Sequence, residues 1–303
     1  MINDKNNITK ISCDHVLLVI GASGFIGKNI FTYFQKKGYT TIGTYNSTPM
    51  DNMYKLDLTS DNLEDLSCDM QHIKYAVISS AIALIDKCKE QEKESYDINV
   101  KGTIHIINQL FERNIFPIFL SSDQVFDGKT GNYSDLDERN PITIYGKHKK
   151  IVEDFLLSHP KKSLIVRLSK TFDISKKEEG VLSTWIQKLI DDGELLCATD
   201  QILSPTYVKD VSRAIYTAIN NEMSGCYNVC SPEAYSRFEL ASKIKTQLGI
   251  KTGKIVPCHI SDFNFTDARP LNTSLDPTKF INETNFEFTR MHMCIDKLGK
   301  KYF

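Results

Sequence analysis

The sequence lacks any apolar stretch that approaches the roughly 20 residues needed to cross a bilayer. It also lacks a basic excess, because 37 Lys and Arg stand against 38 Asp and Glu, whereas nucleic-acid-binding domains usually carry a clustered excess of positive charge. The polar start, MINDKNNITKISCDH, contains no apolar segment of the kind found in secretion signals. These absences predict a cytoplasmic protein that binds neither nucleic acid nor membranes.

The eight cysteines include no C-x-x-C pair, and the closest two, Cys226 and Cys230, lie in the apolar run GCYNVC. In a chain of 303 residues without a secretion signal, cysteines are expected to stay reduced. Cys258 and His259 are too isolated to suggest a metal site, so no metal is predicted. A chain of this length can bury a sizeable core without disulfides or metals.

The first half of the chain alternates apolar, strand-like runs with amphipathic helical stretches. Strands are expected at HVLLVI (15–20) and FPIFLSS (116–122), and a helix from Phe25 to Lys37. Over residues 94–113 a helical repeat places packing residues at every fourth position, namely Ile98, Gly102, Ile106 and Leu110. This alternation predicts an α/β fold with a doubly wound, Rossmann-like parallel sheet covered by helices on both faces.

The alternation loosens after about residue 170, and the end of the chain is expected to be irregular. We therefore divide the chain into a flexible tail (1–14), a dinucleotide-binding domain (15–170) and a smaller C-terminal α/β lobe (171–303) that mainly binds substrate. No low-complexity linker separates the last two. Segments within about 200–230 are therefore expected to return to the first domain.

A glycine-rich loop, GASGFIG, lies between the first expected strand and helix. Glycines allow a tight turn and a close approach of the backbone to a pyrophosphate, and the helix N-terminus adds N–H groups and a partial positive charge. The spacing is G-x-x-G-x-x-G, and its strand–turn–helix context is the one that a dinucleotide site requires. The predicted cofactor-binding residues of this loop are Gly21, Ser23, Gly24, Phe25, Ile26 and Gly27.

The second expected strand ends in Tyr-Asn-Ser at 45–47, with neither the acid that binds the ribose of NAD nor an arginine for the 2′-phosphate of NADP. Because no carboxylate would repel that phosphate, NADP(H) is favoured slightly and NAD(H) stays open. Asp57, after the third strand, is predicted to accept a hydrogen bond from the adenine amino group. Its alternative role is to cap a turn at Thr59 and Ser60.

The pattern Y-x-x-x-K places a phenol and an ammonium one helical turn apart, and it occurs twice. An ammonium stabilises a phenolate and lowers a pKa that is otherwise ~10. Tyr33 and Lys37 lie on the helix after the glycine loop, where a role in packing explains their presence. Tyr145 and Lys149 begin a helix after a long polar loop, and we predict that they take part in proton transfer.

Position supports the second pair. Ligands of open parallel sheets bind beyond the carboxyl ends of the strands. Ser121 and Ser122 stand at such an end, and the next loop leads to Tyr145. Ser122, Tyr145 and Lys149 are therefore expected to meet beside the cofactor as a catalytic trio, with Tyr145 and Lys149 also contacting the cofactor.

Taken in order, these motifs resemble the extended short-chain dehydrogenases/reductases. The series is GASGFIG, Asp57, Asn99 in DINVKGT, SSDQVFDG and YGKHK. Two later segments, DQILSPTYVKDVSRAI and RPLNTSLD, resemble the branch that contains dTDP-4-dehydrorhamnose reductase. The resemblance implies that Ser122, Tyr145 and Lys149 are catalytic and that Asn99 is a structural and proton-relay residue at the cofactor site.

The resemblance further implies an NAD(P)H-dependent reductase. Hydride would pass to the C4 carbonyl of a nucleotide-linked 4-keto-6-deoxy sugar, in deoxysugar or cell-surface glycan biosynthesis. Related dehydratases carry Thr-Asp-Glu where this chain has Ser122, Asp123 and Gln124, and Gln124 cannot take up a proton, so dehydration is disfavoured. Reductases of the branch usually have Tyr in place of Gln124 and Trp near Lys170, so the identity of the sugar stays open.

Three residues are predicted to bind the substrate, a nucleotide-diphosphate sugar. Asp123 and Gln124 follow Ser122 at the strand end, where Asp123 would orient the sugar. Arg269 would clamp the diphosphate, because a guanidinium fork matches phosphate oxygens. Its alternative is a surface ion pair.

Two other functions fit the same motifs. The methionine adenosyltransferase beta subunit shares the SSD-x-VFDG and YGK-x-K features, and by that resemblance the chain would be a non-catalytic, NADP-binding regulatory subunit. A sugar-nucleotide 4-epimerase would use the same trio with retained NAD. A homodimer is one arrangement that the sequence leaves open.

Overall fold

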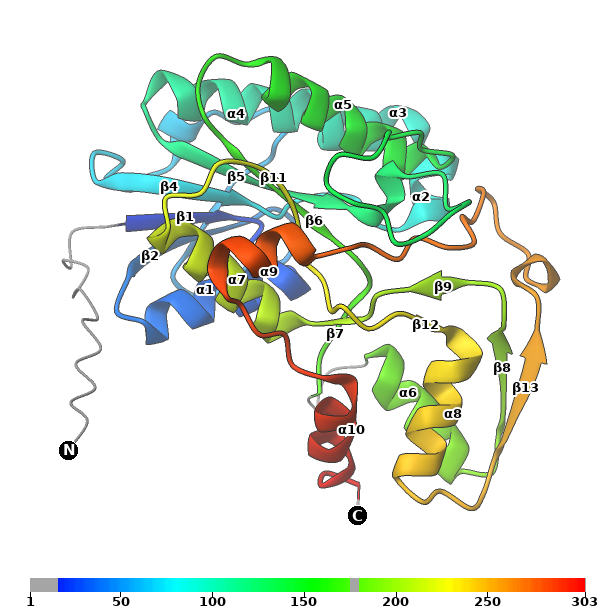
Figure 1. Ribbon diagram of the computed structural model, residues 1–303. Helices are drawn as coiled ribbons and strands as arrows, with labels where there is room; N and C mark the ends of the chain where they lie inside the picture. Colours follow the sequence, from blue (N-terminus) through cyan, green and yellow to red (C-terminus); the bar gives the residue numbers. More distant parts are fainter. Residues whose placement is uncertain (1–15, 175–179, 303) are drawn as a thin grey trace, which may run out of the picture.

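A seven-stranded parallel sheet forms the centre of the molecule (Figure 1). The computed structural model describes residues 16–174 and 180–302, so the tail predicted for 1–14 lies outside the described residues. In spatial order the strands are β11 (Gly225–Asn228), β6 (Leu164–Leu168), β5 (Phe116–Ser122), β4 (Ile73–Ile78), β1 (Val16–Ile20), β2 (Thr40–Tyr45) and β3 (Met53–Lys55). From β1 the chain runs outward through β2 and β3, and then in the other direction through β4, β5 and β6. This topology confirms the predicted doubly wound, Rossmann-like α/β fold.

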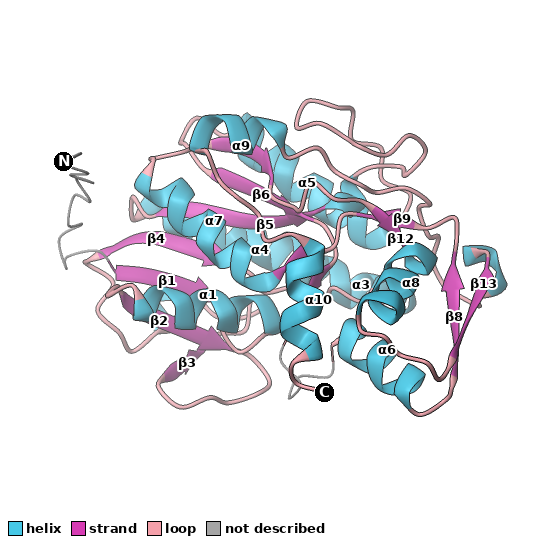
Figure 2. Cartoon of the chain, turned by 60° about the horizontal axis from the view of Figure 1, so that its bottom comes forward, coloured by secondary structure: helices cyan, strands magenta, loops and turns pink. Residues whose placement is uncertain are grey.

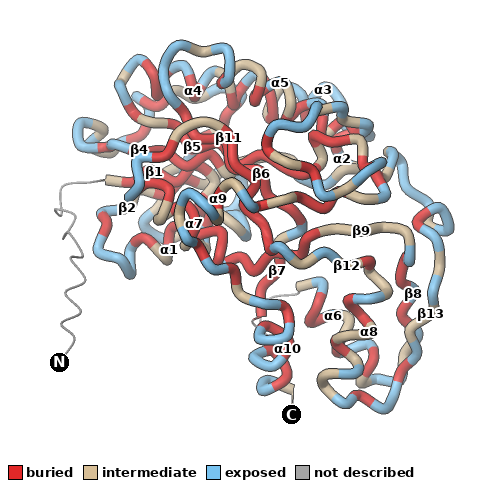
Figure 3. Tube along the Cα trace, viewed as in Figure 1, coloured by how far each residue is buried: buried red, intermediate tan, exposed pale blue. Residues whose placement is uncertain are grey.

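Helices cover both faces of the sheet and create two cores. They are α1 (Phe25–Lys36), α4 (Thr103–Glu112), α5 (Ile144–Ser158), α7 (Val208–Asn220) and α9 (Thr278–Thr284). Leu17 and Val19 of β1 pack with α1, α7 and α9, whereas Leu18 and Ile20 pack with α4 and α5. Because successive strand residues point to opposite faces, one apolar run supplies both cores. Figure 2 shows the arrows of β1, β2, β4 and β5 side by side, and Figure 3 shows that β1, β4 and β5 are mostly buried.

The long helix expected over 94–113 is interrupted. The chain after β4 forms α2 (Ile85–Glu90), α3 (Glu92–Tyr96), a π-helical turn η2 (Asp97–Gly102) and then α4. A Cβ on Gly102 would collide with the carbonyl oxygen of Leu58. The turn therefore brings this helix against the loop after β3.

The C-terminal part of the chain builds a third core beside the sheet. Its elements are α6 (Val181–Ile190), β8 (Glu194–Ala198), α8 (Arg237–Gln247), β13 (Lys254–Cys258) and α10 (Met291–Gly299). β8 and β13 form a separate parallel pair, and buried residues of α6, α8 and α10 pack together (Figure 1). The expectation of an irregular end is wrong, because β13, α9 and α10 all lie there.

Two short strand pairs join this part to the sheet. They are β7 (Thr171–Phe172) with β10 (Thr206–Tyr207), and β9 (Ile202–Leu203) with β12 (Tyr235–Ser236). Between them the chain forms α7, which packs on α1, and β11, which pairs with β6 at the edge of the central sheet. The carboxyl ends of β5 and β6 therefore face residues of the C-terminal part.

Candidate active site

The turn between β1 and α1 admits only glycine at two positions. Gly21 has a φ of +83°, and a Cβ there would lie 2.8 Å from the backbone nitrogen of Ser80. A Cβ on Gly27 would collide with the carbonyl oxygen of Gly21. Helix α1 begins at Phe25, and its N-cap residue, Gly24, makes no side-chain capping bond. The backbone thus forms a cradle at a helix N-terminus, which fits a pyrophosphate.

The other predicted loop residues border this cradle. Phe25 is 41% exposed, a high value for a phenylalanine that begins a core helix. Ser23 is half-buried. Ile26 packs against the core and also lines the cavity described next.

A cavity of about 280 Å³ opens at the carboxyl edge of the sheet. It lies where the strand order reverses between β1 and β4, the usual ligand position in such sheets. The loop after β4 is tied to β1, because Ser79 Oγ donates to the carbonyl oxygen of Ile20 at 2.7 Å. The lining includes Ile26, Ser122, Tyr145 and Lys149. Residues far apart in sequence, from the glycine loop and from the predicted trio, therefore meet in one cavity.

Local contacts fix the position of Tyr145 at the start of α5. Thr143 caps the helix, with its Oγ1 accepting from the Gly146 N–H at 2.9 Å. A Cβ on Gly146 would collide with the carbonyl oxygen of Gln124. Since α5 can approach that closely only with glycine there, Tyr145 is brought beside the end of β5.

Lys149 lies one helical turn after Tyr145. Its Nζ donates to the carbonyl oxygen of Leu120 at 2.8 Å and lies 5.7 Å from the centre of the Tyr145 ring. Burial lowers the pKa of the Lys149 ammonium to about 8, although the nearby Glu153 carboxylate opposes this effect. The amine is therefore held in one place with a pKa close to neutrality.

The pKa of Tyr145 is raised, mainly by burial and then by the Asp123 carboxylate and the Cys88 thiol, while contact with the Ser122 hydroxyl lowers it. The expectation of a lowered phenol pKa is therefore wrong in this structure. Burial of the phenol is the main cause, and the Lys149 amine does not offset it because it donates to the carbonyl oxygen of Leu120. Tyr145 accordingly keeps its proton at neutral pH, which suits a proton donor.

Asp123 is the centre of a buried hydrogen-bond cluster. Its carboxylate accepts from Ser122 Oγ at 2.9 Å and from Gln124 Nε2 at 3.3 Å through Oδ1, and from Ser169 Oγ at 3.1 Å and Thr273 Oγ1 at 2.9 Å through Oδ2. Burial raises the pKa of Asp123, and these donors oppose the rise. Asp123 therefore joins β5, β6 and the segment near Thr273, and its oxygens are already engaged.

Gln124 presents an unsatisfied acceptor at the cavity. Its Nε2 donates to Asp123, which fixes the orientation of the amide because a flipped amide would place oxygen against a carboxylate. Its Oε1 is buried and has no hydrogen-bond partner among the described residues. A buried acceptor without a donor is costly, so a ligand hydroxyl at this atom would be favourable.

Asn99 is buried in η2 and holds the loop after β4. Its Oδ1 accepts from the N–H of Ile82 at 2.8 Å, and its Nδ2 donates to the carbonyl oxygen of the same residue at 2.9 Å. Both ends of the amide are thus used on the backbone. These contacts give Asn99 a structural role at the wall of the site.

Asp57 lies at the turn after β3. Its Oδ1 accepts from the N–H of Thr59 at 2.9 Å and from Thr59 Oγ1 at 2.7 Å. These bonds correspond to the turn-capping alternative. An adenine contact through the same carboxylate stays a prediction.

Arg269 lines the cavity, but its guanidinium is already paired. Nη2 lies 2.7 Å from Asp86 Oδ2, and Nη1 donates to the carbonyl oxygens of Asp267 and Ala268. The guanidinium also lies 4.1 Å from the centre of the Phe265 ring. The fork predicted to clamp a diphosphate is therefore held by an ion pair within the protein.

The second Y-x-x-x-K pair lies elsewhere. Tyr33 packs edge-on against Tyr216, with ring centres 5.9 Å apart, in the core between α1 and α7. Lys37 Nζ lies 5.3 Å from the Tyr216 ring. This pair is an aromatic packing feature, as its position after the glycine loop suggested.

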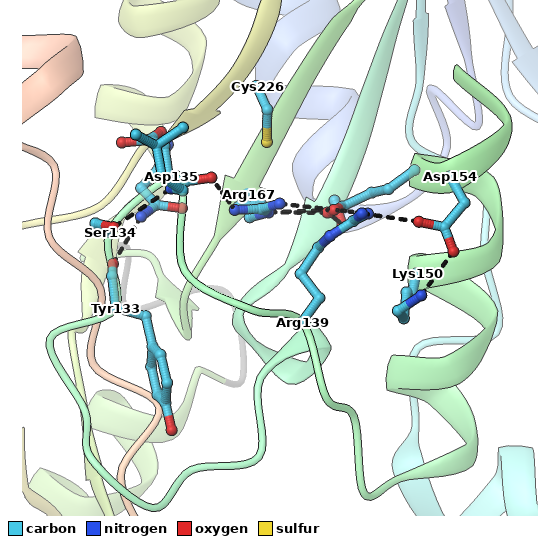
Figure 4. Close-up of polar contacts among 12 residues, drawn as sticks. Tyr133, Ser134, Asp135, Arg139, Lys150, Asp154, Arg167 and Cys226 are labelled. Carbon is cyan, nitrogen blue, oxygen red and sulfur yellow. Dashed lines mark hydrogen bonds and ion pairs between the residues drawn. The ribbon is translucent and has the colours of Figure 1, made fainter. Parts of the chain in front are cut away.

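The helix of the trio, α5, also carries a buried ion network that the sequence analysis missed; Figure 4 shows Arg139, Arg167 and Asp154 of this network. Glu153, fully buried one turn after Lys149, accepts from Ser121 Oγ at 2.5 Å, from Arg167 Nη2 at 2.9 Å and from Arg139 Nη1 at 3.0 Å. Arg167 is itself only 2% exposed. The spacing of four residues between Lys149 and Glu153 was the available signal, and it indicates a shared helix face.

Two further properties concern the described residues, 16–174 and 180–302. No group of three or more His, Cys, Asp or Glu side chains there is arranged to hold a metal ion. No helix in the same residues is long and apolar enough to span a membrane.

Comparison with known proteins gives consistent matches. The family model described as "RmlD substrate binding domain" matches residues 15–301. The dTDP-4-dehydrorhamnose reductase of Aggregatibacter actinomycetemcomitans is 26% identical over 275 residues, covering 87% of this chain and 91% of that protein. The methionine adenosyltransferase 2 subunit beta of Mus musculus is 25% identical over 274 residues, covering 87% and 80%.

Solved structures show the same fold. The crystal structure of dTDP-4-dehydrorhamnose reductase from Bacillus anthracis in complex with NADP has a TM-score of 0.80 at 22% identity, covering 94% of this chain and 99% of that one. The family model spans nearly the whole chain, and Ile26 of the glycine loop lines one cavity together with the trio. The chain therefore belongs to the RmlD substrate-binding-domain family, within the extended short-chain dehydrogenases/reductases.

Proposed function

We propose that the protein is an NADP(H)-dependent reductase of the C4 keto group of a nucleotide-linked 4-keto-6-deoxy sugar, similar to dTDP-4-dehydrorhamnose reductase. The observation that carries the proposal is the convergence of Ser122, Tyr145 and Lys149 in the cavity beside the glycine cradle. The relative from Aggregatibacter actinomycetemcomitans bears that enzyme's name. The sugar would serve deoxysugar or cell-surface glycan biosynthesis.

The residues divide the chemistry between them. A bound reduced nicotinamide supplies the hydride that reduces the carbonyl carbon. Tyr145, whose raised pKa keeps the phenol protonated, donates the proton that the carbonyl oxygen needs. Ser122 lies beside the Tyr145 hydroxyl and turns its own hydroxyl from Asp123 toward the reacting oxygen, which stabilises the charge that develops there. Asp123 keeps its other donors during that turn.

Lys149 and Asn99 act on the cofactor side of the site. We assign Lys149 to the nicotinamide ribose, because its amine is fixed at the end of β5. Asn99 shapes the wall beside it. Asp57 is proposed to receive the adenine amino group. The absence of an acid at 45–47 favours NADP(H), the cofactor named for the Bacillus anthracis structure.

Gln124 is proposed to accept a hydrogen bond from a hydroxyl of the sugar. Its orphaned Oε1 needs a donor, and a sugar hydroxyl supplies one. An acid at this position would transfer a proton during the elimination of water. The Gln124 amide cannot take up a proton, so reduction is favoured over dehydration.

The test is turnover with purified protein, NADPH and a panel of 4-keto-6-deoxy sugar nucleotides. Reduction consumes NADPH, and the absorbance of the reduced nicotinamide falls with each equivalent of substrate. The methionine adenosyltransferase beta subunits among the relatives support a second candidate, a regulatory subunit. Tight NADPH binding with no turnover on any sugar nucleotide would favour that candidate. Conversion of substrate with no net change in NADPH would favour a 4-epimerase.

A further inference from the structure

Two cations in the cavity wall have no assigned role. Lys170 and Arg237 line the cavity together with the trio. Lys170 follows Ser169, which donates to Asp123 beside Ser122. Arg237 is the first residue of α8, so it reaches the cavity from the C-terminal part.

Neither cation has a counter-charge in contact. No Asp or Glu of residues 16–174 and 180–302 lies within ion-pair distance of Lys170 or Arg237. Arg237 Nε donates to Gln201 Oε1 at 2.7 Å, which orients the guanidinium. Its Nη1 and Nη2 make no hydrogen bond in the described part of the chain. Lys170 is solvent-accessible at the cavity. The acid that raises its pKa, Asp123, already accepts hydrogen bonds from four side chains.

The two charges also destabilise each other. Burial lowers the pKa of Lys170, and the neighbouring Arg237 lowers it further. Like charges near one another are unfavourable, and an anion that binds both removes this cost. The other two cations of the cavity wall differ, because Asp86 neutralises Arg269 and the amine of Lys149 donates to the carbonyl oxygen of Leu120. Lys170 and Arg237 are therefore the two cations of the cavity wall that have neither an ion-pair partner nor a role in the proposed reaction.

We propose that Lys170 and Arg237 form a subsite for an oxyanion group of the substrate. A guanidinium and an ammonium together match the oxygens of a phosphate or a carboxylate. The group is either a phosphate of the linked diphosphate or a carboxylate on the sugar. The subsite would bind the charged group of the substrate of the proposed reductase, so this inference rests on that function. The anion would then contact Lys170 and Arg237 instead of Arg269, the residue predicted from the sequence.

Trp185, the only tryptophan of the chain, provides a reporter. It lines a narrow apolar slot whose wall includes both Lys170 and Arg237. An anion that binds these two side chains changes the surroundings of the indole. Binding can therefore be followed by Trp185 emission without any turnover, and calorimetry gives the affinity independently.

The experiment titrates full-length protein saturated with NADP with four probes: thymidine diphosphate, uridine diphosphate, glucuronate and glucose. Either diphosphate or glucuronate is expected to bind, more weakly as salt increases, whereas neutral glucose is not. Lys170→Met and Arg237→Met should each weaken that binding about 10- to 100-fold, the range for a lost hydrogen bond to a charged group. The exposed Lys188→Met, on the same helix as Trp185, is the control and should bind as the wild type does.

The outcomes of this titration identify the oxyanion or overturn the subsite. Tight diphosphate binding identifies the phosphate as the source of the oxyanion, and tight glucuronate binding identifies a sugar carboxylate. Wild-type affinity in both Met variants overturns the subsite, as does the absence of binding by any charged probe. Because circular dichroism and NADP affinity report folding separately, a misfolded variant is recognised, and the salt dependence of the wild type still tests the charge. Binding that depends on Lys170 and Arg237, together with no NADPH oxidation by any 4-keto-6-deoxy sugar nucleotide of the turnover panel, would overturn the reductase and leave the subsite standing.

Discussion

The Glu153→Gln substitution removes a carboxylate that two arginines share inside the fold. Glu153 is fully buried, Arg167 is 2% exposed and Arg139 is 19% exposed in its side chain. The amide can still accept a hydrogen bond, but it leaves the positive charge of Arg167 buried without compensation. Breaking a buried ion pair in this way costs about 3–5 kcal/mol, a large part of the roughly 5–15 kcal/mol that stabilises a typical protein.

Urea unfolding followed by circular dichroism measures this loss. The adjacent Asp154→Asn is the matched control, because Asp154 also binds Arg139, at 2.8 Å, but its side chain is 45% exposed (Figure 4). An exposed pair contributes roughly 0–1 kcal/mol. Equal destabilisation by the two substitutions would refute the reasoning that burial makes the Glu153 network costly to break.

Three further predictions concern the cavity. Tyr145→Phe should reduce turnover by ~10²-fold or more with NADPH affinity nearly unchanged, while Tyr33→Phe changes little; full activity of the first variant would remove the phenol from the mechanism. Gly27→Ala drives a Cβ into the Gly21 carbonyl oxygen, so NADPH affinity measured by titration should fall about 10-fold or more, and unchanged affinity would contradict the cradle. Because the pKa of Lys149 is about 8, kcat/KM should fall as pH rises through that value, and at lower pH still in Glu153→Gln; a flat profile would contradict a role for the ammonium.

The sequence predicted the elements whose pattern is local. FPIFLSS is β5 at the expected residues, and the helix after the glycine loop ends within one residue of its expected end. The 94–113 repeat is helical, but it contains a π turn that packs Gly102 against Leu58. The repeat gave no sign of this turn, because Leu58 lies in the loop after β3, 44 positions before Gly102. The same reason hid α9 and α10, which are short and are held by packing on other elements.

The residue types of the site were predictable, and their partners were not. That Ser122, Tyr145 and Lys149 line one cavity could be predicted from position, because ligands of such sheets lie at the strand ends. Whether Arg269 is free depends on Asp86, more than 180 positions away. Likewise, the pKa of Tyr145 depends on how deeply the folded chain buries the phenol. Free charge and burial follow from three-dimensional neighbours, which no spacing in the chain reveals.

The central claim is that hydride passes from the nicotinamide to the sugar C4 beside Tyr145. It is tested most directly with NADPH that carries deuterium at the transferred position, incubated with 4-keto-6-deoxy sugar nucleotides. Mass spectrometry of the product should show one deuterium, bonded at C4, for each NADPH oxidised. A reduced product without deuterium, or bound NADPH that stays unoxidised with every substrate, would contradict the account.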